Sequence, residues 1–117
     1  MRLSEIAGVL DCEVVLGAER LDAIDVRDCF AGDLMSDVLR YSHPGALLIT
    51  GLTSVQSIHT ADVADLTAIL FVSSKTPARE IVDLARARDI PLLTTSRGMF
   101  DVCGVLYRAG LAAAAEA

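Results

Sequence analysis

The chain has 117 residues, a net charge of −6 and a mean hydropathy of +0.50, with 53% hydrophobic residues. This length suits one domain with a single core, so we expect one domain over residues 1–117. No stretch approaches the ~18 consecutive apolar residues of a membrane helix, and the acidic chain has no basic cluster, which argues against membrane and nucleic-acid partners. The apolar surplus fits a core plus a subunit interface, so we expect a homo-oligomer, a dimer in the simplest case.

The three cysteines, Cys12, Cys29 and Cys103, are widely spaced and form no CxxC pair. An odd number at such spacing indicates neither a disulfide framework nor a zinc site. The pattern favours reduced, buried thiols in a cytoplasmic protein, and we expect no metal or other cofactor. The N-terminus has no basic segment followed by an apolar run, so we expect no secretory signal.

The first forty residues predict short elements. Ser4 is a plausible cap for a brief helix, and residues 13–16 are typical of a strand. Residues 21–28 alternate apolar with polar side chains, which predicts a strand with one solvated face at a sheet edge. Asp33 is then expected to cap another helix. The inner face of that helix would carry Leu34, Met35, Val38 and Leu39.

From residue 45 onward, short apolar runs alternate with helical patterns. The runs cover residues 45–51, 66–72 and 90–93, and each leads into a segment rich in Ser or Thr. Continuous apolar runs of this length are typical of strands covered on both faces, as in a parallel sheet. A helix is predicted after each run. One of them is expected to begin at Thr76-Pro77, because proline suits the first helical position.

This order of elements predicts an α/β fold. We expect a three-layer α/β/α arrangement with a mostly parallel central sheet and a small α/β N-terminal extension. Right-handed connections would place the carboxyl ends of the parallel strands on one edge, where open α/β sheets bind ligands. The alanine-rich tail, residues 111–117, is expected to be a helical end.

Hydroxyl side chains and the chain's one lysine follow the three predicted central strands. Hydroxyl and backbone N–H donors together with an ammonium group suit a small anion at the strand ends. The candidate ligand-binding residues are Thr50, Gly51, Thr53, Ser54, Ser73, Ser74, Lys75, Thr94, Thr95 and Ser96. The alternative is purely structural, because Ser and Thr also cap helices and form turns.

No catalytic residue is predicted. The chain has no GxxxxGK[ST] loop, the element that would hold the phosphates of a kinase substrate. His59, Asp62 and Asp65 share helical spacing and could suggest a metal pair or a base. A solvated helix face explains them more simply, because no third ligand or nucleophile is apparent. We therefore expect neither enzyme activity nor a metal site.

Four segments carry a resemblance to a known family. They are ITG at residues 49–51, AILFVSSKTP at 68–77, ARARDIPLLTTS at 85–96 and MFDVCGVLYRAGL at 99–111. Together they resemble the DRTGG domain family. The opening residues, 3–26, and the GDLMSDVL segment look like the short, free-standing members, which are similar to the N-terminal domain of HPr kinase/phosphorylase.

The chain departs from the residues that give the family its name. It has Leu52-Thr53 where the family often has Asp-Arg, and Ser73-Ser74-Lys75 where the family often has Thr-Gly-Gly. The resemblance implies a regulatory module, because DRTGG domains occur beside CBS pairs and phosphotransacetylase domains, contribute to dimerisation and lack known catalytic residues.

We therefore expect a non-catalytic regulatory or sensory module. It would be a cytoplasmic homodimer that binds a small anionic metabolite or nucleotide at the strand-end edge. The alternative is a protein–protein interaction adaptor or dimerisation module without a small-molecule ligand, in which the apolar surplus serves a regulatory protein partner.

Overall fold

The computed structural model describes residues 1–114, and they form one six-stranded sheet with helices on both faces. In chain order the elements are α1 (Leu3–Val9), β1 (Glu13–Leu16), the 3₁₀ helix η1 (Ala18–Ala23), β2 (Asp28–Ala31), α2 (Met35–Tyr41), β3 (Leu47–Thr50), α3 (Val55–Val63), β4 (Ala68–Phe71), α4 (Arg79–Ala87), β5 (Leu92–Thr94), α5 (Met99–Arg108) and β6 (Ala112–Ala113). The predicted strand over residues 13–16 is confirmed as β1.

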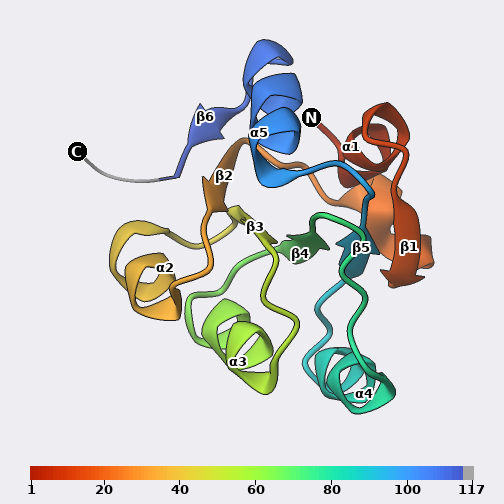
Figure 1. The fold of residues 1–117 in the computed structure, drawn as a ribbon, viewed down its shortest axis with the longest axis vertical. Helices are drawn as coiled ribbons and strands as arrows, with labels where there is room; N and C mark the ends of the chain where they lie inside the picture. Colours follow the sequence, from red (N-terminus) through yellow and green to blue (C-terminus); the bar gives the residue numbers. More distant parts are fainter. Residues whose placement is uncertain (115–117) are drawn as a thin grey trace.

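The strands lie in the order β1-β5-β4-β3-β2-β6. All neighbours are parallel except β1 and β5, which run antiparallel with Glu13 opposite Thr94. The chain steps in one direction from β2 to β5 through α2, α3 and α4, and right-handed crossovers therefore place these three helices on one face. Helix α5 then returns to β6 at the far edge and covers the opposite face together with α1 (Figure 1).

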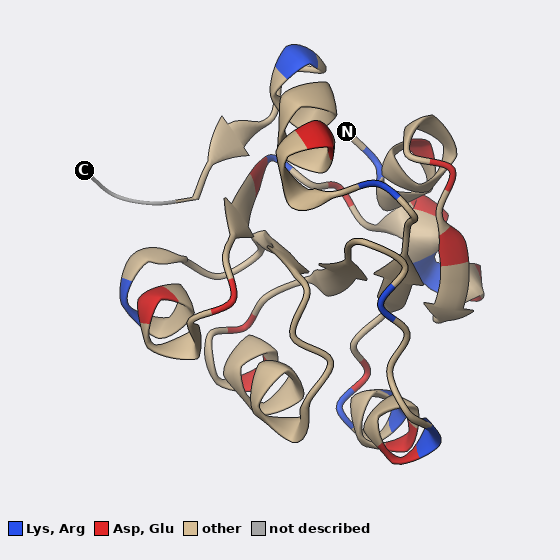
Figure 2. Ribbon diagram, viewed as in Figure 1, with Lys and Arg blue, Asp and Glu red and all other residues tan. Residues whose placement is uncertain are grey.

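The central strands are buried on both faces, which explains their continuous apolar sequence. Within β3, Leu47 and Ile49 pack on the side of α1 and α5, whereas Leu48 packs on the side of α2, α3 and α4. Strands β3 and β4 carry no charged residue, and the charges lie on helices, loops and outer strands (Figure 2). The three-layer α/β/α prediction with a mostly parallel sheet is confirmed.

The predicted edge strand over residues 21–28 is wrong. Residues 18–23 form η1, and only an isolated bridge between Arg2 and Asp25 precedes β2, which lies inside the sheet between β3 and β6. Gly17 begins this region with φ +90°, and a Cβ there would lie 2.9 Å from Pro91 Cβ. The alternating pattern predicted neither the backbone nor the burial, because Leu21 and Val26, which strict alternation would place on opposite faces, are both buried, whereas Ala23 is exposed.

Several helix predictions need correction as well. The first helix has Arg2, not Ser4, as its N-cap, and α4 begins at Arg79 rather than at Thr76-Pro77. Leu34 and Leu39 were expected on the inner face of α2, yet they are 61% and 51% exposed, whereas Met35 and Val38 face the core. The tail was expected to be helical, but Gly110 at φ +102° ends the turn after α5 and the chain continues as β6; residues 115–117 lie outside the described part. Within residues 1–114 no helix is long and apolar enough to cross a membrane.

Candidate functional site

The carboxyl ends of β3, β4 and β5 lie on one edge of the sheet, but the chain leaves them toward different faces. After β3 and β4 it enters α3 and α4 on one face, and after β5 it enters α5 on the other. Adjacent strands whose connections diverge in this way open a crevice between their ends. The divergence falls between β4 and β5.

A pocket of about 230 Å³ lies at this point, and we call it the strand-end pocket. Its lining residues are Asp11, Glu13, Ser74, Thr76, Thr94, Thr95 and Ser96. Four of the ten predicted ligand-binding residues are among them, and Lys75 stands between two of the lining residues. The β3 residues Thr50, Gly51, Thr53 and Ser54 lie outside it, so the predicted site is divided in two.

The end of β3 is occupied by a carboxylate of the protein itself. Asp33, in the loop between β2 and α2, accepts hydrogen bonds from the hydroxyl of Thr50 and the backbone N–H of Gly51, both at 2.8 Å. The Thr50 hydroxyl in turn accepts the N–H of Leu52 at 3.1 Å. The donors that were expected to face an anionic ligand here are therefore used to hold the β2–α2 loop against β3. Asp33 was expected to cap α2, but the N-cap residue is Leu34.

The remaining predicted residues after β3 make fewer contacts. Ser54 has the extended backbone of an N-cap before α3, but its side chain makes no capping hydrogen bond. Its Oγ is buried and has no hydrogen-bond partner among the described residues. Thr53 is half-buried beside it. Ser54 thus confirms the predicted helix start without supplying the hydrogen bond that such a cap normally makes.

The floor of the strand-end pocket is fixed by hydrogen bonds to backbone carbonyls. Thr94 Oγ1 donates to the carbonyl of Lys75 at 2.7 Å, and Thr95 Oγ1 donates to the carbonyl of Leu10 at 2.8 Å. The N–H groups of Ser73 and Ser74 donate to carbonyls of the β5–α5 loop at 2.8 and 2.9 Å. Both serines adopt left-handed backbone conformations, with φ of 57° and 58°. The backbone donors of this turn are therefore used within the protein.

The polar groups that a ligand could contact are consequently the exposed side chains in and beside the pocket. Ser74, Lys75, Thr76 and Ser96 are exposed, and Lys75 makes neither a hydrogen bond nor an ion pair through its ammonium group within residues 1–114. An unpaired ammonium beside hydroxyl groups is the one feature of the predicted anion site that the geometry leaves available to a ligand.

Two acidic residues of the strand-end pocket were not predicted as site residues from the sequence. Glu13 enters because β1 pairs antiparallel with β5 and sets it opposite Thr94, and Asp11 stands just before β1 with φ +50°. Arg97 lies nearby, 4.0 Å from Asp11 and 3.0 Å from Asp101. The charged residues that line the pocket are therefore the two carboxylates, and Arg97 lies next to Asp11 outside the lining. No pattern around residues 11–13 predicted this contact, because it depends on strand pairing across 80 residues.

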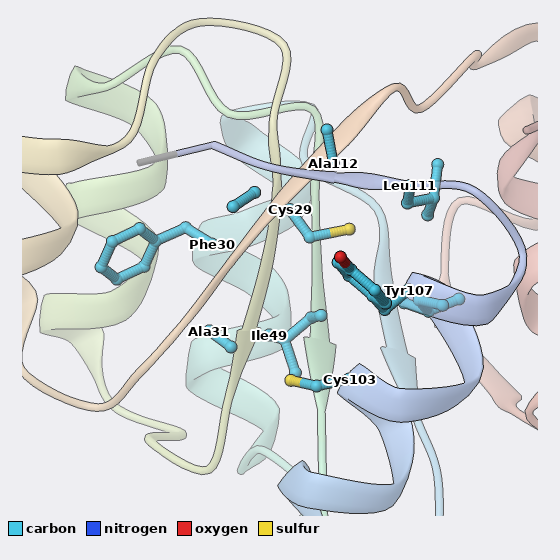
Figure 3. A pocket seen from close by; sticks show the side chains of 10 residues that line it. Cys29, Phe30, Ala31, Ile49, Cys103, Tyr107, Leu111 and Ala112 are labelled. Carbon is cyan, nitrogen blue, oxygen red and sulfur yellow. The ribbon is translucent and has the colours of Figure 1, made fainter. Parts of the chain in front are cut away.

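A second cavity, of about 280 Å³, lies between α5 and the β2–β6 edge and is apolar (Figure 3). Cys29 and Cys103 line it, with Tyr107 at its side. Burial raises the pKa of Cys29 to about 12 and also raises the pKa of Cys103. Cys12 follows the same trend, because burial raises its pKa to about 11. Thiols with raised pKa values stay protonated at neutral pH and are poor nucleophiles or metal ligands.

The remaining candidates for chemistry stand apart. His59 is exposed on α3, and the Asp62 carboxylate pairs with Arg88 at 3.1 Å. Within residues 1–114 there is no group of three or more His, Cys, Asp or Glu side chains that could hold a metal ion. The geometry therefore directs attention to the strand-end pocket as a place for binding.

The fold and the site define a small α/β domain with a polar pocket, lined by hydroxyl and carboxylate side chains, at its parallel strand ends. The family model of the DRTGG domain matches residues 5–109, and the chain belongs to this family. This confirms the resemblance carried by the sequence segments. No curated protein matches the chain.

One similar solved structure is the crystal structure of the CBS and DRTGG domains of the regulatory region of Clostridium perfringens pyrophosphatase, complexed with the activator diadenosine tetraphosphate. The TM-score is 0.69 at 15% sequence identity, over 90% of this chain and 45% of that chain. This chain thus spans less than half of that chain's length, and the likeness is one of fold.

Proposed function

We propose that this domain is a non-catalytic regulatory module that acts as a homodimer and binds a small anionic metabolite, best of all a nucleotide, in the strand-end pocket. The observation that carries the proposal is Lys75, which follows β4 between the pocket-lining residues Ser74 and Thr76 and whose ammonium makes no ion pair within residues 1–114. Membership of the DRTGG family supports a regulatory role. The pyrophosphatase with a similar fold, which is regulated by a dinucleotide activator, supports the choice of ligand class.

The charges of the pocket favour a nucleotide over a simple anion. A phosphate group suits Lys75 and Arg97, whereas the carboxylates of Asp11 and Glu13 would repel it. Carboxylates do accept hydrogen bonds from ribose hydroxyls, as in dinucleotide-binding folds. A ligand with both a sugar and a phosphate therefore has a partner for each kind of side chain.

The size of the pocket limits how the ligand is held. Its volume of about 230 Å³ is below the roughly 300–1,000 Å³ of typical small-molecule sites. The pocket would enclose the sugar and one phosphate, while the base would lie on the open surface outside. We therefore expect moderate affinity and low selectivity among bases.

Isothermal titration calorimetry with ATP, AMP, acetyl phosphate and inorganic phosphate tests this proposal. Lys75→Ala should weaken nucleotide binding about tenfold or more, because a hydrogen bond to a charged group is worth ~1.5–3 kcal/mol. Arg40→Ala is the matched control, since it also removes an exposed cation but on α2, outside the pocket. Absence of binding by all four compounds, or an equal effect of both substitutions, would remove the proposed site.

The adaptor function is supported by a separate observation. Phe100 and Tyr107 on α5 are 94% and 79% exposed, and large side chains of this kind are enriched in interfaces. In this alternative, which has no small-molecule ligand, the exposed face of α5 binds another protein instead of a second copy of the domain. A pull-down with the wild-type domain and with Phe100→Glu tests the adaptor function.

A further inference from the structure

The outward face of α5 carries two rows of side chains. Successive helical residues are rotated by about 100°, so Gly104 stands at the centre of this face. By helical position Phe100 and Tyr107 flank it on one side, the Tyr107 ring also lining the cavity beside Cys29, and Asp101 and Arg108 flank it on the other. A Cβ built on Gly104 would meet nothing within 4 Å, so the surface at this position is open, and glycine places no side chain on it. The face is thus a small depression between an aromatic row and a charged row.

Nothing within residues 1–114 covers this face, and it continues into a shallow groove. Phe100 is 94% exposed and Tyr107 79%, although α5 packs firmly on the sheet through Val102 and Leu106. Between α5 and α1 lies a groove of about 610 Å³, with the half-exposed Val9 on its far wall. Contiguous apolar surface of this kind marks an interaction site more often than single exposed residues do.

We propose that this face is the homodimer interface, with α5 of two copies packed antiparallel about a two-fold axis at Gly104. The assignment rests on the proposed function for the existence of a dimer and adds where the two copies meet. A two-fold interface must be complementary to itself: if one residue of the first copy contacts a second residue of the other copy, the same contact occurs with the two copies exchanged. The two rows on α5 satisfy this condition.

The axial positions of the side chains provide the match. Phe100 lies four residues before Gly104 and Tyr107 three after it, while Asp101 lies three before and Arg108 four after. At 1.5 Å per residue, an antiparallel copy brings each Phe100 level with Tyr107 of the second copy to within about 1.5 Å along the axis. The same rotation brings each Asp101 level with Arg108 of the second copy.

The charges select the antiparallel arrangement. Figure 2 shows the acidic position near the start of α5 and the basic position at its end. Asp101 pairs with Arg97 at 3.0 Å, and Arg108 has no ion pair within residues 1–114. A parallel pair would set the charged row of one copy against the aromatic row of the other, so neither row would meet its complement. The antiparallel pair gives Arg108 a carboxylate and stacks the aromatic rings.

The expected area makes this a dimer of moderate strength. An aromatic side chain buries roughly 150–250 Å², so Phe100 and Tyr107 supply about 300–500 Å² per copy at most. A standard interface needs about 800 Å² per partner. The groove residues around Val9 extend the contact without doubling it. We therefore expect dissociation in the micromolar range, and the experiment must cover that range.

Sedimentation velocity from 5 to 200 µM tests the interface. The wild-type domain should dimerise with rising concentration, and Phe100→Glu should remain monomeric throughout. Val63→Glu is the matched control, because Val63 is 75% exposed at the end of α3. Gly104→Cys, in a background with the native cysteines replaced by serine, should form an intermolecular disulfide, because the axis sets this position beside its own copy. Val63→Cys in the same background should not.

The possible outcomes distinguish the existence of a dimer from the location of its interface. A monomeric wild-type domain at 200 µM would overturn both, while nucleotide binding at the strand-end pocket could still be measured. A dimer that persists in Phe100→Glu but not in Val63→Glu would retain the proposed dimer and overturn the α5 interface. Arg108→Asp should weaken the dimer, and adding Asp101→Arg should restore part of the loss. A second loss instead of a restoration would overturn the antiparallel pairing.

Discussion

The ends of β3 and β5 are alike in sequence, since each strand finishes in threonine and leads into a polar loop. At β3 the Thr50 hydroxyl and the next N–H both bind the Asp33 carboxylate. At β5 the hydroxyls of Thr94 and Thr95 bind backbone carbonyls, and a pocket stays open beside them. The difference follows from topology, because β3 and β4 send the chain to one face whereas β4 and β5 send it to opposite faces. A hydroxyl-rich strand end therefore becomes a pocket only where the connections diverge.

The largest loss of stability is expected from Asp33→Ala, at the end of β3, where the Asp33 carboxylate occupies the strand end. The substitution leaves the buried Thr50 hydroxyl and the Gly51 N–H without their acceptor, which should cost about 1–3 kcal/mol of unfolding free energy. Urea denaturation with an unchanged m-value measures this loss. Asp22→Ala, at an exposed position of η1, is the control. Equal stability of the two variants would show that Asp33 does not hold this strand end.

A smaller loss is expected at the open end from Thr95→Val, which keeps the shape of the side chain. The carbonyl of Leu10 and the N–H of Arg97 lose their partner, and Thr95 is only 3% exposed. The bonds are between neutral groups, so about 1 kcal/mol is expected. Ser96→Ala, at the next and exposed position, should stay within about 0.5 kcal/mol of wild type. If Ser96→Ala proved as costly in urea, the floor of the pocket would not be fixed as described.

Much of the difference between the ends of β3 and β5 could not be predicted from the sequence. The apolar runs of β3, β4 and β5 predicted buried parallel strands correctly, because strands covered on both faces have no other composition available. The hydroxyl residues were found for the same reason, since they follow those runs. Asp33 was predicted only as a helix cap and Glu13 only as part of a strand over residues 13–16, because local patterns reveal neither the loop that crosses to β3 nor the antiparallel pairing of β1.

The same limit explains the error over residues 21–28. Leu21, Ile24 and Val26 are buried, but their separations of three and two residues do not follow the alternation of a strand, and residues 18–23 form a 3₁₀ helix instead. The backbone conformation of this segment depends on the close approach of Gly17 to Pro91, a tertiary contact across more than 70 residues. Packing, and not the apolar periodicity alone, therefore determines the backbone of this segment.

The next prediction concerns the acidic side chains of the strand-end pocket. Asp11→Asn removes a carboxylate from the strand-end pocket, and asparagine tolerates the positive φ of this position. Inorganic phosphate should bind a few fold more tightly, because exposed charges of this kind contribute up to about 1 kcal/mol. AMP should gain less or lose affinity, because the carboxylate that would accept its ribose hydroxyl is gone. Calorimetry with both ligands decides, with Asp37→Asn on α2 as control, and an equal gain for both would exclude the ribose contact.

The smallest effect is expected from Ser54→Ala, at the closed end. An N-cap serine normally contributes about 1 kcal/mol, but Ser54 Oγ makes no capping bond and is buried without a partner among the described residues. Its removal should therefore change the unfolding free energy by no more than about 0.5 kcal/mol in urea denaturation. Ser57→Ala is the comparison, because Ser57 Oγ donates to the Ser54 carbonyl at 2.7 Å and should cost about 1 kcal/mol. A loss at Ser54 as large as at Ser57 would mean that its hydroxyl has a partner in solution, and the end of β3 would then join β4 and β5 as a place where a ligand or an ordered water binds.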